Sequence, residues 1–196
     1  MTQPQSSFAS PGVELERYRH YLAALARAQV DPGLRDRVDL SGVVQQTFLE
    51  AHQNLHELNG ATPEQLAGWL RQILAHNLAD AMRNLGAAKR NAARQRSLEA
   101  ALEQSSLRLG NWLASPDQSS PSLNLQRQER AVQLADALAE LPDAQREALV
   151  LRYWHDWPLA RISQHLGRTP AAVAGLLKRG LKELRGTMRE EFGETP

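Results

Sequence analysis

The sequence predicts an all-α protein made of two small helical domains joined by a flexible linker. Three observations support this prediction. Good helix formers, chiefly Ala, Leu, Gln, Glu and Arg, dominate the chain, and strand signals are nearly absent. Apolar residues recur at three- and four-residue spacing through most of its length. Residues 115–122 (SPDQSSPS) are rich in Ser and Pro and contain no apolar residue, a composition typical of linkers.

Length and composition restrict the class of protein. A chain of 196 residues can hold one domain or two small ones. It has no cysteine, which excludes disulfides, thiolate zinc sites and cysteine nucleophiles and suits a cytoplasmic protein. No apolar run approaches the roughly 20 residues of a membrane span, so no membrane insertion is expected. The start of the chain lacks a secretory signal, and residues 1–12 are predicted to be a disordered tail.

Helical periodicity predicts three helices in the first domain, at residues 13–29, 40–58 and from 63 to about 85. The first ends at Asp31-Pro32-Gly33. Thr62 and Gln65 form a capping box that starts the third. In the second helix we expect one face to be buried, formed by Val44, Phe48, Ala51 and Leu55. The other face is expected to be polar and exposed, and consists of Gln45, Gln46, Glu50, Gln53 and Asn54.

Residues 71–96 carry far more basic than acidic side chains, with Asp80 as their single acid. This segment is interpreted either as a solvated helix end, since cations suit helix C-termini, or as a phosphate-binding surface. After it, residues 97–113 are weakly amphipathic, and the domain boundary is placed in the polar segment that follows.

The second domain is predicted to contain a helix at 123–140, another beginning near Asp143, and then a helix-turn-helix at residues 157–185. Gly167 suits a left-handed helix end, Thr169 an N-cap and Pro170 the first position of the next helix. That helix has an apolar side and, opposite, a basic outer face. Such a pattern favours a DNA-reading motif, and the alternative is a helical hairpin with a solvated basic face.

Motifs for enzymatic chemistry are absent. There is no P-loop, no Gly-rich dinucleotide turn and no nucleophile motif, so no catalytic residue and no cofactor is predicted. His52 and His56 have a spacing that could hold a metal, but the sequence places no third ligand beside them, and they are interpreted as surface or partly buried histidines. We therefore predict neither a metal site nor an enzyme.

Several of these segments, in order, resemble the extracytoplasmic-function (ECF) group of bacterial RNA polymerase sigma factors, which have only the second and fourth sigma domains. Residues 43–48 (VVQQTF) resemble the family's D-hydrophobic-V-Q-E-T-F run, with Gly42 and Gln46 in place of the usual acids. Residues 68–83 resemble the A-W-L…I-A-R-N-L-x-x-D-x-x-R helix, and residues 141–153 the L-P…R-x-x-x-x-L-R-Y run. The resemblance covers about residues 13–96 and 123–186.

The resemblance implies a sigma region 2-like domain at 13–96, a linker at 97–122 and a sigma region 4-like helix-turn-helix domain at 123–190. It implies three sets of site residues. Docking on the coiled coil of the polymerase β′ subunit would involve Val43, Gln45, Gln46, Phe48 and Glu50. The minus-ten element, with a base flipped into the loop at 58–63, would meet Asn59, Gly60, Thr62, Arg71, His76, Asn77 and Arg83. The minus-thirty-five element would meet Arg168, Thr169, Ala171, Ala172, Gly175, Lys178, Arg179, Lys182 and Arg185.

The predicted function is that of a sigma factor, which binds core RNA polymerase through its β′ and β subunits and directs transcription initiation at promoters. Its expected partners are double-stranded promoter DNA, the single-stranded non-template minus-ten strand and, as a further candidate, an anti-sigma factor. Two alternatives remain at this point. One is a helix-turn-helix regulator acting independently of core polymerase, with a helical dimerisation or sensing domain, and the other is a helical adaptor that binds no nucleic acid.

Overall fold

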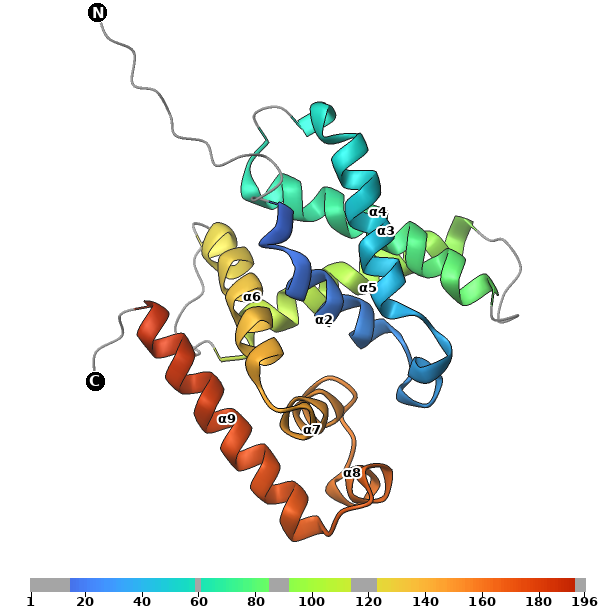
Figure 1. The fold of residues 1–196 in the computed structure, drawn as a ribbon. Helices are drawn as coiled ribbons and strands as arrows, with labels where there is room; N and C mark the ends of the chain where they lie inside the picture. The colour runs from blue at the N-terminus through green and yellow to red at the C-terminus, as the bar shows by residue number, and fades with distance from the viewer. Residues whose placement is uncertain (1–14, 59–60, 85–91, 114–122, 193–196) are drawn as a thin grey trace, which may run out of the picture.

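The computed structural model describes residues 15–58, 61–84, 92–113 and 123–192 (Figure 1). These residues form helices joined by short turns, and no strand occurs among them. The all-α prediction is confirmed. The predicted tail at residues 1–12 lies outside the described residues.

In the described residues of the first part of the chain, the elements whose bounds are given are α2 (Arg19–Gln29), η1 (Pro32–Arg37), α3 (Leu40–Gln53), η2 (Leu55–Leu58), α4 (Pro63–Asn84) and α5 (Ala92–Asn111). Local chemistry sets several of these bounds. The Asp31 carboxylate accepts a hydrogen bond from the Gly33 amide at 2.8 Å and so starts η1. The predicted capping box is present, since Thr62 N donates to Gln65 Oε1 at 2.8 Å and Gln65 N donates to Thr62 Oγ1 at 3.3 Å.

Two expectations for this part need correction. The helix expected at 40–58 ends at Gln53, where Asn54 Nδ2 bonds the Glu50 carbonyl at 2.9 Å and η2 follows. Residues 97–111, assigned to the linker, belong to α5, in which Leu102 and Leu109 are buried. Because α5 packs against α2, α4 and α6, its weak amphipathicity reflects burial on more than one side. Residues 114–122 of the expected linker are outside the described part.

The second part of the chain contains α6 (Leu123–Glu140), α7 (Asp143–Tyr153), α8 (Leu159–Leu166) and α9 (Pro170–Phe192). In Figure 1, the long α9 runs beside α6 and α7, and α8 lies at the end of α9 where the turn between them is made. Pro142 precedes the first residue of α7, as its missing N–H permits.

A continuous hydrophobic core joins both parts of the chain. It extends from Leu15 and the apolar face of α2, through Leu70, Leu74 and Leu78 of α4, to Leu184 of α9. Helix α6 is central to this core, because it contacts α2, α4 and α5 on one side and α9 on the other. A second, smaller core holds α7, α8 and the start of α9 together.

Candidate nucleic-acid interface

The helix-turn-helix formed by α8 and α9 is set by two local devices and a small core. Gly167 ends α8 in the left-handed region at φ 60°, where no L side chain is comfortable. Thr169 caps α9, because its Oγ1 accepts from the Ala172 amide at 3.2 Å. Ile162 of α8 and Val173 of α9 are fully buried against Trp157. The turn therefore holds the N-terminal half of α9 at a fixed angle to α8.

The opposite face of α9 carries small residues at its start and cations from Lys178 onward. All the predicted minus-thirty-five residues except Gly175 are exposed, namely Arg168, Thr169, Ala171, Ala172, Lys178, Arg179, Lys182 and Arg185. None of the five cations in this set forms an ion pair with any residue in the described part of the chain. An unpaired row of cations on a protruding helix is able to bind phosphates or base edges.

On this face, the absence of a side chain at Gly175 leaves space for the Arg179 side chain. A Cβ built on Gly175 would lie 3.3 Å from Nη1 of Arg179, so the arginine side chain folds back over the glycine. The surface formed by Arg168, Lys178, Arg179, Lys182 and Arg185 is called the α9 basic face below.

The predicted minus-ten residues fall into three structural groups. Thr62 and His76 are exposed, and Arg83 is partly exposed. Asp80 organises the latter two, because it forms an ion pair with Arg83 and its Oδ2 lies 3.8 Å from His76 Nε2. Asn59 and Gly60 lie outside the described residues.

Arg71 and Asn77 are placed differently from the prediction. The Arg71 side chain is 11% exposed, forms an ion pair with Glu103 and donates to Tyr21 Oη at 2.7 Å and to Gln128 Oε1 at 3.2 Å. Asn77 is buried and its Nδ2 donates to Thr47 Oγ1 at 3.3 Å. Both residues therefore make internal contacts in this arrangement, because α2, α3, α5 and α6 cover the faces of α4 on which they lie.

The residues of α3 that were predicted to dock on polymerase also include both buried and exposed side chains. Val43 and Phe48 belong to the core, at 7% and 4% exposure, and are corrected from contact residues to supporting residues. Gln45 and Gln46 are exposed, and Gln46 Nε2 donates to Glu50 Oε1 at 2.8 Å. Leu49 is 52% exposed beside them and was not predicted. Leu49 is apolar but lies one position outside the buried stripe of α3, and this pattern in the sequence could have identified it.

Gly42 has a physical reason to stand where the resembled family has an acid. The Asp39 carboxylate caps α3 by accepting from the Gly42 amide at 2.8 Å. A Cβ at position 42 would collide with that carboxylate. The cap geometry of this chain therefore excludes a side chain at position 42 unless Asp39 moves.

Other kinds of site find little support in the described part of the chain. No group of three or more potential metal ligands occurs there, and His52 and His56 are both exposed. None of the helices searched there is both long and apolar enough to cross a membrane.

Comparisons with known proteins agree with this geometry. Residues 131–184, which run from α6 through the helix-turn-helix, match the family model described as Sigma-70, region 4. The chain is 29% identical over 155 residues to the ECF RNA polymerase sigma factor SigL of Mycobacterium tuberculosis, in strains Erdman, CDC 1551 and H37Rv, covering 79% of this chain and 77% of each relative. A region 4 match placed on an exposed basic helix, together with similarity across most of the all-α chain, makes the protein similar to the ECF RNA polymerase sigma factors.

Proposed function

We propose that the protein binds core RNA polymerase, through its β′ and β subunits, and directs it to promoters at two DNA elements. The observation that carries the proposal is the α9 basic face, held on a rigid helix-turn-helix within the region 4 match. The polymerase performs the chemistry, and this chain supplies recognition. An anti-sigma factor is a further candidate partner, to which we assign no residues.

Recognition of the minus-thirty-five element is assigned to the start of α9. Arg168 and Thr169 lie at the turn, and small residues follow them, so the helix backbone can approach the major groove closely. Arg179 is the candidate base reader further along, because it folds over Gly175 toward the exposed N-terminal part of the helix. Lys182 and Arg185 are assigned to phosphate contacts.

Opening of the minus-ten element is assigned to the loop before α4 and to the exposed side of that helix. Thr62, His76 and Arg83 are the described residues that could contact the separated strand, and Asn59 and Gly60 belong to the same proposal. A flipped base needs a pocket and a cationic track beside it, and Arg83 supplies a cation.

Docking on β′ is assigned to the outer face of α3, which consists of Gln45, Gln46, Leu49 and Glu50. Leu49 gives this face an apolar centre of the kind found in protein interfaces, with polar residues around it. Val43, Val44 and Phe48 hold the helix in place from the core side.

The proposal is tested by core polymerase capture. The double variant Gln45→Lys, Gln46→Lys should reduce capture of the protein by immobilised core polymerase, because two cations replace the polar contacts of this face. The double variant Gln104→Lys, Asn111→Lys on the exposed side of α5 is the matched control, since it adds the same two charges elsewhere. Undiminished capture of the double variant would remove the α3 assignment, and failure of the unmodified protein to bind core polymerase would remove the proposed function itself.

A further inference from the structure

A cavity of about 470 Å³ lies where α2, α3, α6 and α7 meet, and it shares no lining residue with the surfaces assigned to DNA. Cavities of this size are typical of small-molecule sites. Each helix turns one stripe of its residues toward the space. On α7, for example, Arg146, Val150 and Trp154 line it at four-residue spacing. The cavity is therefore formed by the meeting of four helices, and we call it the α2–α7 cavity.

Small residues leave this space unfilled. Ala23 and Ala24 of α2 and Ala135 and Ala139 of α6 all line the cavity, and α2 packs against α6. An Ala side chain ends at Cβ, so at these four positions neither helix has a side chain long enough to fill the space between them. Protein interiors contain few voids larger than a water molecule. A cavity of this volume among packed helices is therefore a candidate binding site.

The α2–α7 cavity has an apolar floor and opens to solvent on one side. The buried lining residues are all apolar, namely Val44, Ala135, Leu138 and Val150. The exposed lining residues mark the opening, and they are His20, Ala23 and Ser41. A molecule with an apolar end and a polar end fits this division, because its apolar end is removed from water while its polar end stays at the opening.

The charged groups that line the cavity are all cationic. Arg19, Arg27 and Arg146 line it with partly exposed side chains, and neither Asp nor Glu occurs among its lining residues in the described part of the chain. Cavities lined by charges of one sign attract ligands of the opposite sign. The polar end of the occupant is therefore expected to be an anion.

Arg27 has the most hydrogen-bond donors available for such an anion. Arg19 is held by Glu16 through two hydrogen bonds, and Arg146 is held by two backbone carbonyls and an ion pair. Arg27 makes a single hydrogen bond, from Nη2 to Glu147 Oε2 at 2.5 Å. Its buried Nε has no hydrogen-bond partner in the described part of the chain. Such an unpaired buried donor is costly unless a ligand accepts from it.

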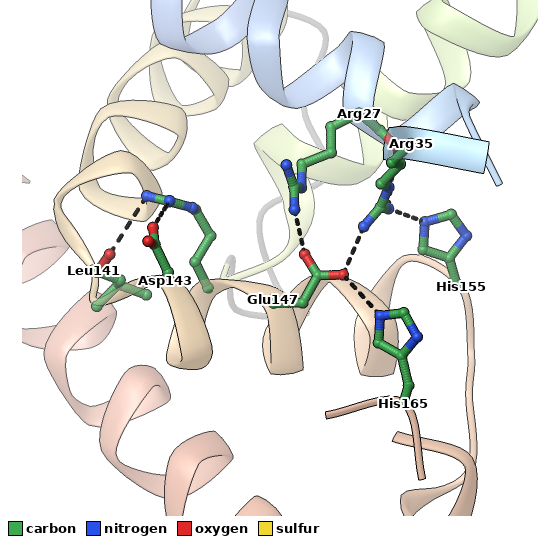
Figure 2. Close-up of polar contacts among 8 residues, drawn as sticks. Arg27, Arg35, Leu141, Asp143, Glu147, His155 and His165 are labelled. Carbon is green, nitrogen blue, oxygen red and sulfur yellow. Dashed lines mark hydrogen bonds and ion pairs between the residues drawn. The ribbon is translucent and has the colours of Figure 1, made fainter. Parts of the chain in front are cut away.

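The neighbours of Arg27 also leave room for a second carboxylate. Figure 2 shows Arg27 and Arg35 both directed at Glu147, and Arg35 Nη1 donates to Glu147 Oε1 at 2.8 Å. Two guanidinium groups thus share one carboxylate, so one positive charge is left without a carboxylate of its own. A planar guanidinium matches a carboxylate through two parallel hydrogen bonds, and Nε with an Nη group forms one such pair of donors.

We infer that the α2–α7 cavity binds a free medium-chain aliphatic carboxylate. Its carboxylate accepts hydrogen bonds from Arg27, and its hydrocarbon chain lies on the apolar floor formed by α3, α6 and α7. The floor supplies affinity by removing apolar surface from water, and Arg27 supplies the selection for an anion. This inference does not depend on the proposed function, because the cavity lies outside both surfaces assigned to DNA.

Isothermal titration calorimetry of the full chain with decanoate, kept below the concentration at which it forms micelles, tests the inference. Decanoate should bind at one site. Decyltrimethylammonium has the same hydrocarbon chain with the opposite charge and should bind about tenfold more weakly or worse. Acetate has the carboxylate without the chain and should also bind about tenfold more weakly or worse. Absence of decanoate binding would overturn the inference, and so would equal affinity for either comparison ligand.

A charge variant tests the role of Arg27. Arg27→Gln should weaken decanoate binding about tenfold or more, because a charge-assisted hydrogen-bonded pair is lost. Arg37→Gln is the matched control, since it removes the same charge from an exposed position on η1 and should keep the affinity of the unmodified protein. Unchanged affinity in Arg27→Gln, or an equal loss in Arg37→Gln, would overturn the inference.

A second variant tests the cavity itself without removing the contact between Arg27 and Glu147. Ala23→Phe places a large side chain at the exposed opening and should weaken decanoate binding about tenfold or more by occupying the entrance. Ala100→Phe, at an exposed position of α5, is the matched control and should bind decanoate as the unmodified protein does. Unchanged affinity in Ala23→Phe would place the ligand outside this cavity and overturn the inference.

Discussion

His155 follows α7 and meets Arg35 of η1, whose Nη2 donates to His155 Nε2 at 2.7 Å (Figure 2). Burial lowers the pKa of His155, and the neighbouring Arg35 guanidinium lowers it further. Arg108 acts in the same direction, while Asp31 and Glu147 oppose it. Neutral His155 can accept the hydrogen bond from Arg35, whereas a protonated imidazole would face that guanidinium with a like charge.

This arrangement predicts a contribution of His155 to pH-dependent stability. Because the pKa is lower in the folded protein than the value of about 6.5 in an unfolded chain, the unfolded state binds the proton first. The stabilisation is present above about pH 6.5 and is lost as the pH falls through the lowered pKa. The free energy of unfolding of His155→Gln, measured with urea, should therefore fall less than that of the unmodified protein between neutral and mildly acid pH. For His56→Gln, at an exposed site on η2, the free energy of unfolding should fall with pH as it does in the unmodified protein. Parallel curves for all three proteins would contradict the assignment.

Helix α9 presents two kinds of cation along one face, and their roles should separate on substitution. Arg179→Ala, like Arg168→Ala, should relax base preference within the minus-thirty-five element by about 1–3 kcal/mol at one position if its contact is bidentate. Lys182→Ala should weaken binding to all sequences alike and reduce the salt dependence by about one phosphate contact. Duplex binding measured over a panel of sequences and salt concentrations distinguishes the two. Uniform loss of affinity in both arginine variants would remove the base-reading role.

Helices α5 and α6 approach each other closely at Gly110. A Cβ on Gly110 would lie 2.5 Å from the backbone carbonyl oxygen of Arg127, and backbone atoms cannot move aside as a flexible side chain can. Gly110→Ala should therefore force the two helices apart and lower the free energy of unfolding by about 1–3 kcal/mol.

The matched control is Gly186→Ala in α9, where nothing lies within 4 Å of the added Cβ. There the substitution should raise the free energy of unfolding by about 0.5–1 kcal/mol, because Ala favours the helix. Urea denaturation of both variants measures the difference. Equal stability of the two variants would mean that α5 and α6 are not packed as described.

At the scale of the whole molecule, Glu147 of α7 ties residues 123–192 to residues 15–113, because it accepts from Arg27 at 2.5 Å and from Arg35 at 2.8 Å. Glu147→Ala leaves the buried Arg35 guanidinium without its carboxylate, and an uncompensated buried charge costs about 3–5 kcal/mol. The variant should therefore loosen the packing between these two parts of the chain, and its radius of gyration from small-angle X-ray scattering should exceed that of the unmodified protein. Glu140→Ala at the exposed end of α6 is the control and should leave the radius unchanged. An unaltered radius in Glu147→Ala would show that the hydrophobic core alone keeps these two parts of the chain together.

Much of the local helix geometry could be predicted from the sequence because short-range chemistry sets it. Gly167 at the left-handed position, the Thr169 cap and the Thr62–Gln65 capping box each depend on residues within three or four positions. The inward and outward faces of α3 were predicted for the same reason, since helical geometry fixes which side chains share a side.

The sequence by itself thus determined the helices, their caps and the basic face of α9, and it predicted the family to which the chain is similar. The tertiary structure decided which of the predicted polar residues are available. Arg71 resembles a DNA contact in sequence, yet Gln128 and Glu103, far along the chain, enclose its guanidinium. Residues 97–111 read as part of a linker, yet they form a buried helix because α2, α4 and α6 surround it. The physical reason is that burial and pairing depend on helices brought together across long sequence separations, which local periodicity and motif spacing do not encode.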